Sequence, residues 1–280
     1  MKKVFLTFGD GGERYVAACR RLTEEARRTG QFDEVLGCNW GDVTEETLSS
    51  PLRVLKRGGG YWLWKADLVW QTLSRLTDGD ILVWCDAGNV IYPCRRQWRR
   101  LFSLLDDVEM VVPKIFACGL NWHRKELLEL FGADIPGGCK MCYQFEATVL
   151  VIRKTERTYR LAQEWRTFIL RHPECVRDVE TDSERAAQLA GYFENRADQS
   201  ILTMLVYKYM ALGCPIRACW DFHLGLNVFG RPAILVARNK SGSAHRMSLA
   251  FRLRRAVERI VWAVQDRLER RGIRICWLHV

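Results

Sequence analysis

Residues 58–88 read GGGYWLWKADLVWQTLSRLTDGDILVWCDAG and contain the clearest structural pattern in the chain. Residues 65–77 place apolar side chains at helical spacing, and a tight Asp-Gly-Asp turn follows at 78–80. Residues 81–85 are almost wholly apolar, which predicts a central strand buried on both faces. That strand ends at the Asp-Ala-Gly of 86–88. A helix, a turn and a buried strand in this order are typical of α/β proteins.

The flanking segments extend this α/β pattern. Residues 3–8 (KVFLTF) predict a first strand, 13–29 an amphipathic helix closed by Gly30, and 32–38 a second strand. A strand, helix and strand in succession favour a parallel sheet. We therefore expect a single α/β domain over residues 1–240. Further helices are expected at 95–106, 123–131, 155–171 and 197–211, and further strands at 109–116, 144–152 and 233–237.

The positive charge is concentrated at the C-terminal end. The chain has 43 Lys and Arg against 33 Asp and Glu, a net charge of +10. Residues 238–280 contain eleven of these basic residues and three acidic ones, a net +8, so the body is nearly neutral. Residues 247–271 predict a basic amphipathic helix within a tail spanning 241–280. Such a helix either lies on an anionic membrane surface, here through 246–271, or packs its apolar stripe on the domain.

Composition excludes several classes of protein. With 48% hydrophobic and 27% charged residues, the chain is not disordered. It has no apolar run of the roughly 18–20 residues that a membrane span needs. The first residues, MKKVFLTFGD, do not resemble a signal peptide, so we expect a cytoplasmic protein. It would be peripheral on a membrane if the tail binds there. We expect its eleven cysteines to be free thiols.

Several short motifs predict nothing specific. The Cys-x-x-Cys at 139–142 is alone, whereas a zinc ribbon needs a second pair. Metalloprotease, nucleophile-elbow and phosphate-loop motifs do not occur. A nearly neutral body without a recognition motif makes nucleic acid an unexpected partner.

Chemistry is expected where the buried strand ends, because open parallel sheets bind ligands at the carboxyl ends of their strands. Asp86 stands there, and a carboxylate at that place is solvated, paired or metal-bound, or else caps the next turn. Ahead of it, Tyr61, Trp62 and Lys65 follow three glycines. Aromatic rings stack on bases and sugars and a lysine neutralises phosphate. The alternative is that the tryptophans are core and Lys65 is a solvated charge.

Four separated segments together resemble one family. They are KVFLTFGD at the start, Gly-Tyr-Trp-x-Trp-Lys with Asp-Gly-Asp and Asp-Ala-Gly within 60–88, QFEATVLVIRKT at 144–155 and ENRADQSILTMLVYKY at 194–209. In this order they resemble GT-A-like glycosyltransferases of cell-surface polysaccharide synthesis, of which related domains occur in some large viruses. The resemblance covers roughly residues 3 to 210 and implies a GT-A-like, Rossmann-type domain with a mixed, mostly parallel sheet.

The resemblance also implies site residues. Asp86 and Asp198 would be catalytic, Asp198 orienting the donor or deprotonating the acceptor hydroxyl; its alternative role is to cap a helix. Asp86 would also hold Mn²⁺ or Mg²⁺ at the donor diphosphate. The metal-binding motif of the family has a second Asp where this chain has Gly88, and family members often have a histidine where this chain has Ala237. The implied donor-binding residues are Thr7, Phe8, Tyr61, Trp62, Lys65, Asp86, Ala87, Gly88 and Arg238, and the implied sugar or acceptor residues are Gln144, Glu146 and Gln199.

The implied reaction moves a sugar from a nucleotide-sugar donor, a UDP-sugar being expected, to a hydroxyl of a glycan or lipid-linked acceptor. Two other functions remain open. One is a non-enzymatic basic protein that binds membrane or nucleic acid through its C-terminal helix. The other is a nucleotidyltransferase on a similar sheet, which would release pyrophosphate.

Overall fold

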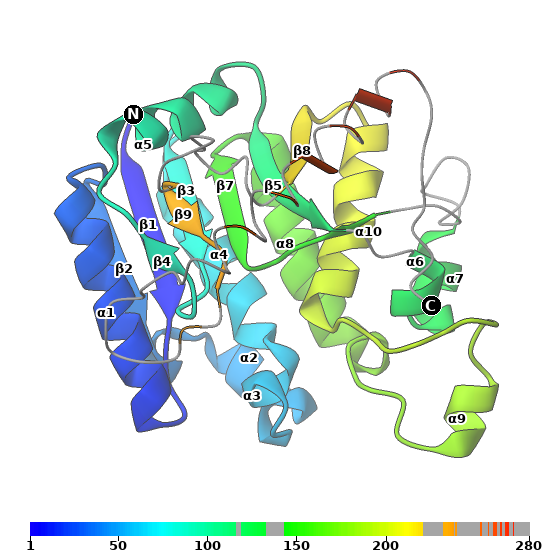
Figure 1. The fold of residues 1–280 in the computed structure, drawn as a ribbon. Helices are drawn as coiled ribbons and strands as arrows, with labels where there is room; N and C mark the ends of the chain where they lie inside the picture. The colour runs from blue at the N-terminus through cyan, green and yellow to red at the C-terminus, as the bar shows by residue number, and fades with distance from the viewer. Residues whose placement is uncertain are drawn as a thin grey trace.

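The computed structural model of the 280-residue chain describes residues 1–115, 119–132, 143–220, 232–237 and 239, and isolated residues between 253 and 271. A central sheet with helices on both faces forms the body (Figure 1). Its strands are β1 (Lys3–Phe8), β2 (Glu34–Cys38), β3 (Ile81–Cys85), β5 (Met110–Ile115), β6 (Gln144–Phe145), β7 (Val149–Arg153) and β8 (Ile216–Trp220); β4 (Val90–Ile91) pairs with β9 (Ile234–Leu235) apart from it.

The sheet is mixed. Strands β2, β1 and β3 are parallel neighbours, β7 runs antiparallel between β3 and β5, and β8 is parallel to β5. The short β6 pairs antiparallel with the far end of β5. Five of the seven strands described in this sheet therefore run in the same direction. The predicted fold class, an α/β domain with a mixed and mostly parallel sheet, is confirmed.

Helices cover the two faces of the sheet. The longer ones are α1 (Glu13–Thr29), α4 (Leu63–Arg75), α5 (Arg95–Ser103), α8 (Glu156–Arg171) and α10 (Asp198–Ala211). Short helices are α2 (Glu45–Leu48), α3 (Gly58–Tyr61), α6 (Gly119–Trp122), α7 (Lys125–Phe131) and α9 (Asp182–Ala186). Figure 1 places α4, α8 and α10 over one face, and α1 and α5 over the other.

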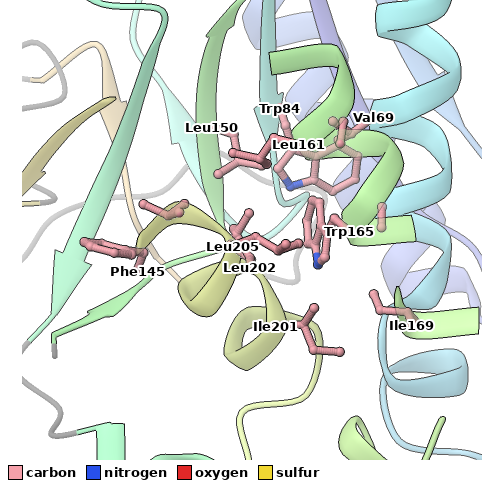
Figure 2. Packing of buried hydrophobic residues seen from close by; sticks show 14 of the residues in the cluster. Val69, Trp84, Phe145, Leu150, Leu161, Trp165, Ile169, Ile201, Leu202 and Leu205 are labelled. Carbon is pink, nitrogen blue, oxygen red and sulfur yellow. The ribbon is translucent and has the colours of Figure 1, made fainter. Parts of the chain in front are cut away.

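Strand β3 is central and buried, as its apolar sequence predicts. Its alternate side chains enter two cores, as the two-residue repeat of a strand requires. Trp84 joins the larger core, where Trp165 of α8 and Leu202 and Leu205 of α10 pack (Figure 2). Val83 enters the second core with residues of α1 and α5. Burying both faces of β3 fixes where its last residue leaves the sheet.

A buried ion pair fastens α4 to α8. Arg166 Nε lies 2.6 Å from Oδ1 of Asp67, whose side chain is fully buried and also accepts hydrogen bonds from Thr44 and Thr47. These donors hold the pKa of Asp67 below its usual value despite burial. Because Asp67 stands two residues after Lys65, this network fixes the helix that carries the lysine.

Several element boundaries differ from the prediction. Helix α4 begins at Leu63 instead of residue 65, since a left-handed residue precedes it. The helix predicted over 95–106 ends as a 3-10 turn, and the strand predicted over 144–152 is divided into β6 and β7. Strands β4 and β8 and the short helices α2, α3, α6 and α9 were not predicted, because each is too short for a periodic pattern or lacks one.

The predicted C-terminal helix lies mostly outside the described residues, and the domain boundary at 240 stays a prediction. Those residues of it that the structure does describe include exposed apolar positions at helical spacing, namely Leu253, Val257, Ile260, Val261 and Val264. In the described part of the chain, every helix is too short or too polar to cross a bilayer.

Candidate active site

A left-handed turn leads into α4. Gly58, Gly59, Gly60, Tyr61 and Trp62 all have φ between 55° and 89°. Successive L-residues in this conformation cost about 1–2 kcal/mol each, which explains why three of the five are glycine. A Cβ on Gly60 would lie 2.7 Å from the Leu52 carbonyl oxygen. The glycines at 58–60 are therefore required by the backbone conformation that leads into α4.

Lys65 lies between two carboxylates. Its Nζ is 3.2 Å from Oδ1 of Asp86 and 3.2 Å from Oδ2 of Asp198, and it donates to the Ala147 carbonyl oxygen at 3.1 Å. Four chain segments thus meet at one ammonium group. The side chain of Lys65 is 3% exposed, that of Asp198 5% and that of Asp86 27%. Asp86 is accordingly the member that a ligand reaches from solvent, and Lys65 is not the solvated charge of the alternative interpretation.

Burial shifts the pKa values in this cluster. Loss of hydration raises the pKa of Asp198 to about 6, an effect that Lys65 partly offsets. The pKa of Asp86 is raised for the same reason, with Lys65 and the Trp84 indole acting against it. The pKa of Lys65 is also raised, because the two carboxylates outweigh its own desolvation. A charged lysine facing an acid with a pKa near 6 is an arrangement suited to proton transfer near neutral pH.

Aromatic rings pack beside the charged cluster of Lys65, Asp86 and Asp198. Phe8 stacks on Trp64 at 4.0 Å, and Trp64 packs against Trp84 at 5.9 Å. Trp84 Nε1 donates to Oδ1 of Asp86 at 3.0 Å. Sequence reasoning did not single out Trp84, although a residue two places before Asp86 on a strand shares its face. The rings exclude water beneath the charges and orient the Asp86 carboxylate.

Two glutamines lie beside Asp198. Gln199 Nε2 donates to Oε1 of Gln144 at 3.1 Å, and Gln144 Nε2 is 3.3 Å from Nε2 of His123. Burial lowers the pKa of His123 to about 3, so this ring is neutral. The structure therefore brings together Gln144 and Gln199, which the resemblance assigned to the sugar. His123 was not predicted, because a histidine with no motif around it carries no signal.

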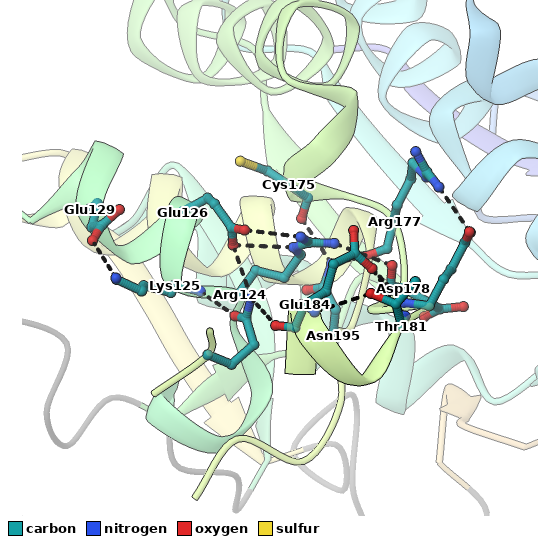
Figure 3. Close-up of polar contacts among 12 residues, drawn as sticks. Arg124, Lys125, Glu126, Glu129, Cys175, Arg177, Asp178, Thr181, Glu184 and Asn195 are labelled. Atoms are coloured by element: carbon teal, nitrogen blue, oxygen red, sulfur yellow. Dashed lines mark hydrogen bonds and ion pairs between the residues drawn. The ribbon is translucent and has the colours of Figure 1, made fainter. Parts of the chain in front are cut away.

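The segment after α8 closes over Tyr61. The Tyr61 hydroxyl donates to Oδ2 of Asp178 at 3.1 Å, and Arg57 pairs with the same carboxylate. Asp178 stands in a polar network that joins α7 to α9, in which Asn195 donates to the Cys175 and Arg177 carbonyl oxygens (Figure 3). Tyr61 therefore anchors this segment through its hydroxyl, which is hydrogen-bonded to Asp178.

The residue before Asp198 has an unfavourable backbone conformation. Ala197 is the N-cap of α10 with φ 51° and ψ −126°, and no side chain caps this helix. Asp198 is thus the first helical residue and does not take the N-cap position of the alternative interpretation. In the described part of the chain, the non-glycine residues with positive φ are Tyr61, Trp62 and Ala197. In the sequence, each lies within four residues of Lys65 or Asp198, and strained residues are common near functional sites.

Replacing Ala197 with glycine is expected to stabilise the protein. Glycine adopts this conformation without the steric cost, and the relief exceeds its greater entropy loss, so we expect a gain of about 1 kcal/mol. Chemical denaturation measures it. As the matched control, Ala211→Gly at the other end of α10, where φ is not positive, should lose about 0.5 kcal/mol. Equal losses at both positions would show that Ala197 is unstrained.

The remaining predicted residues have other surroundings. Thr7 is fully buried in β1, while the Ala87 and Gly88 carbonyl oxygens accept hydrogen bonds from Arg21 and from the Asn239 amide. Glu146 accepts from the Thr148 hydroxyl at 3.3 Å. Trp62 is half-buried against the larger core. Arg238, like the Cys-x-x-Cys at 139–142, lies outside the described residues.

The divalent metal predicted at Asp86 stays a prediction. Asp86 is the one carboxylate of its motif, and its Oδ1 is shared by Trp84 and Lys65. Among the described residues, no group of three or more His, Cys, Asp or Glu side chains comes close enough together to hold a metal ion. Lys65 already supplies positive charge at this place.

A surface pocket of about 410 Å³ opens at the ends of β1 and β2. Gly9 and Asp10, which follow Phe8, line it together with Arg20, Cys38 and Asn39. None of the predicted donor residues lines this pocket. The candidate active site is therefore the charged cluster, which shares no residue with this pocket.

No protein-family model matches the chain, and the comparison with curated proteins gives no match. Several solved structures are similar at low identity. Mouse xyloside xylosyltransferase 1 is 10% identical, with 78% of this chain and 84% of that chain covered and a TM-score of 0.40.

Two further structures are similar to a comparable degree. A glycosyltransferase involved in the glycosylation of the major capsid of PBCV-1 is 11% identical, over 62% of this chain and 68% of that chain, with a TM-score of 0.35. The galactosyltransferase LgtC, solved with donor and acceptor sugar analogs, is 15% identical over 78% and 72%, with a TM-score of 0.35. Values this low do not establish a shared activity.

Proposed function

We propose that this chain is a glycosyltransferase that moves a sugar from a nucleotide-sugar donor to a hydroxyl of a glycan or lipid-linked acceptor. One observation carries the proposal: Lys65, Asp86 and Asp198, separated in sequence, meet within 3.2 Å at the edge of the sheet. The family resemblance of the sequence assigns the same three residues to the donor and the reaction.

The roles follow from exposure and charge. Asp86 is the most exposed member and faces the donor, whose diphosphate brings negative charge. Lys65 Nζ is the cation available to balance that charge as the nucleoside diphosphate departs. Asp198, with its pKa of about 6, takes the proton of the acceptor hydroxyl. Gln144 and Gln199 line the place next to it, where a sugar would bind.

The pH dependence of transfer tests the role of Asp198. A base must be ionised, so we expect kcat/KM to rise with pH through an apparent pKa of about 6 and then level off. Initial rates measured from about pH 5 to 8 give this profile. In Asp198→Asn the remaining kcat/KM should no longer fall at low pH. If kcat/KM of that variant still falls at low pH with the same apparent pKa, the ionising group is a residue other than Asp198.

A donor panel tests the reaction itself. Binding and hydrolysis of UDP-, GDP-, dTDP- and CMP-sugars are measured with the purified chain, and we expect one nucleotide, a UDP-sugar by the resemblance, to bind and be cleaved. The Mn²⁺ or Mg²⁺ ion predicted at Asp86 is tested in the same assay by comparing EDTA with added metal. Failure of every donor to bind under both conditions would reject the proposal. Release of pyrophosphate from a nucleoside triphosphate would indicate a nucleotidyltransferase instead.

We also propose that the tail docks on an anionic membrane surface, beside a lipid-linked acceptor. The described apolar residues of its helix are exposed, which leaves their stripe available to lipid. The nine basic residues of the tail, 241–280, supply the electrostatic attraction. Sedimentation with vesicles that contain anionic lipid should depend on salt and be lost on removing residues 246–280. Sedimentation that survives the truncation would assign binding to the body, and binding without any sugar transfer would favour the non-enzymatic alternative.

A further inference from the structure

Arg21 is a buried arginine that the proposed reaction does not use. It stands in the middle of α1, on the opposite face of the sheet from Lys65, with a side chain 5% exposed. Its Nη1 is 2.9 Å from Oε1 of Glu25, one turn further along the helix. A guanidinium at such depth needs several acceptors to offset its lost hydration.

Those acceptors belong to the loop that carries Asp86. Arg21 Nη2 donates to the Ala87 carbonyl oxygen at 2.8 Å and to that of Asn89 at 2.9 Å. It also lies 3.3 Å from the Asn239 carbonyl oxygen. Glu25 completes the contact by accepting from the Ile91 amide at 2.9 Å. One buried ion pair on α1 therefore binds the main chain on both sides of Gly88.

The same loop is fastened to a distant part of the chain. The Asn239 amide donates to the Gly88 carbonyl oxygen at 2.8 Å, and the Ala237 amide donates to Oδ1 of Asn89 at 3.1 Å. The Asn89 side chain is buried and donates to the Thr148 carbonyl oxygen at 3.1 Å. Arg21 thus contacts both the 87–89 loop and Asn239, which lies 218 positions after Arg21 in the chain.

We infer that Arg21, oriented by Glu25, is a positioning residue for the donor-binding loop 86–89. Asp86 leaves the sheet at the end of β3, so its direction depends on how the next three residues turn. The planar fork of arginine engages several carbonyl oxygens at fixed angles, whereas the single ammonium of a lysine cannot reach the same set together with Glu25. This inference rests on the proposed function for its catalytic consequence, but not for the loop geometry.

The helix provides a matched control. Arg28 and Glu24 form a second ion pair at the same four-residue spacing, at 3.3 Å, with side chains 72% and 49% exposed. Arg21→Met and Arg28→Met remove the same group from the same helix, one beneath the loop and the other on the surface. Arg21→Lys and Glu25→Gln are milder changes that keep the protein folded if Arg21→Met does not.

Hydrogen exchange of the backbone amides of residues 86–91 tests the geometry without any substrate. In Arg21→Met, and to a smaller extent in Arg21→Lys and Glu25→Gln, we expect exchange in this loop to accelerate about tenfold while α10 stays unchanged. Arg28→Met should match the parent protein. Unchanged exchange in all Arg21 and Glu25 variants would overturn the inference, whether or not the chain proves to be a glycosyltransferase.

Kinetics tests the consequence. The donor KM of the folded Arg21 variants should rise about tenfold, with the acceptor KM unchanged, because the donor loop alone is misplaced. A general loss of stability would lower the amount of active enzyme and leave both KM values as they were, and that result would also overturn the positioning role. If no sugar nucleotide is a substrate, the proposed function fails and the exchange measurement alone decides.

Discussion

Lys65→Met is expected to abolish transfer and to destabilise the fold by about 3–5 kcal/mol, the usual cost of removing one partner from a buried ion pair. Without the ammonium group, Asp86 and Asp198 face each other with no positive charge between them. The enclosed side chain of Lys65, 3% exposed, leaves little water to replace it. Urea denaturation and initial transfer rates measure the two losses.

The destabilisation of this variant should grow with pH. The pKa of Asp198 in the folded protein, already raised from 3.8 to about 6, rises further when Lys65 is removed. A carboxyl whose folded pKa is raised binds its proton more tightly when folded, so stability falls as pH rises above the unfolded pKa, until the folded pKa is passed. The difference from the parent protein is therefore smaller at pH 5 than at pH 8.

Two controls accompany Lys65→Met. Lys125→Met removes an exposed lysine paired with Glu129 on the surface, and should change stability by less than about 0.5 kcal/mol. The double variant Lys65→Met with Asp198→Asn should regain stability but not activity, because it removes a buried charge and restores none of the chemistry. Transfer at the parent rate in Lys65→Met would exclude the lysine from the reaction.

Asp86→Asn and Asp198→Asn are each expected to lower transfer by roughly 10²–10⁴-fold, the range found for groups that take part in proton transfer or stabilise charge. The two should differ in kind. In the proposed function Asp86, the more exposed of the two, faces the donor, so Asp86→Asn should weaken donor binding. Asp198 is 5% exposed and in the proposed function acts on the acceptor, so Asp198→Asn should lower kcat while donor binding is kept.

Thermal unfolding and equilibrium donor binding, measured beside the rates, separate these effects from a folding defect. Asp107→Asn, at an exposed position before β5, serves as the control and should leave the rates unchanged. Near-parent activity in both Asp86→Asn and Asp198→Asn would remove these carboxylates from the mechanism and, with them, the basis of the proposed function.

Much of the scaffold was predictable because it depends on local pattern. The α1 prediction over 13–29 and its end at Gly30 match the structure, since apolar spacing and a left-handed glycine are both readable in sequence. The burial of β3 followed from its apolar composition. The division between β6 and β7 was not predicted, because the break depends on how β5 pairs with each part.

The sequence by itself determined the order of the longer helices and of most strands, and the place of Asp86 at the end of a buried strand, because hydrophobic spacing and turn residues act over a few positions. Only the tertiary structure decided that Lys65 is enclosed, that Asp198 follows a strained alanine and that Arg21 binds the main chain of the 87–89 loop from the other face of the sheet. These contacts join residues from 21 to 218 positions apart. Burial at such separations depends on how the whole sheet packs, and it is burial that turns three ordinary side chains into a charged cluster with an acid whose pKa is about 6.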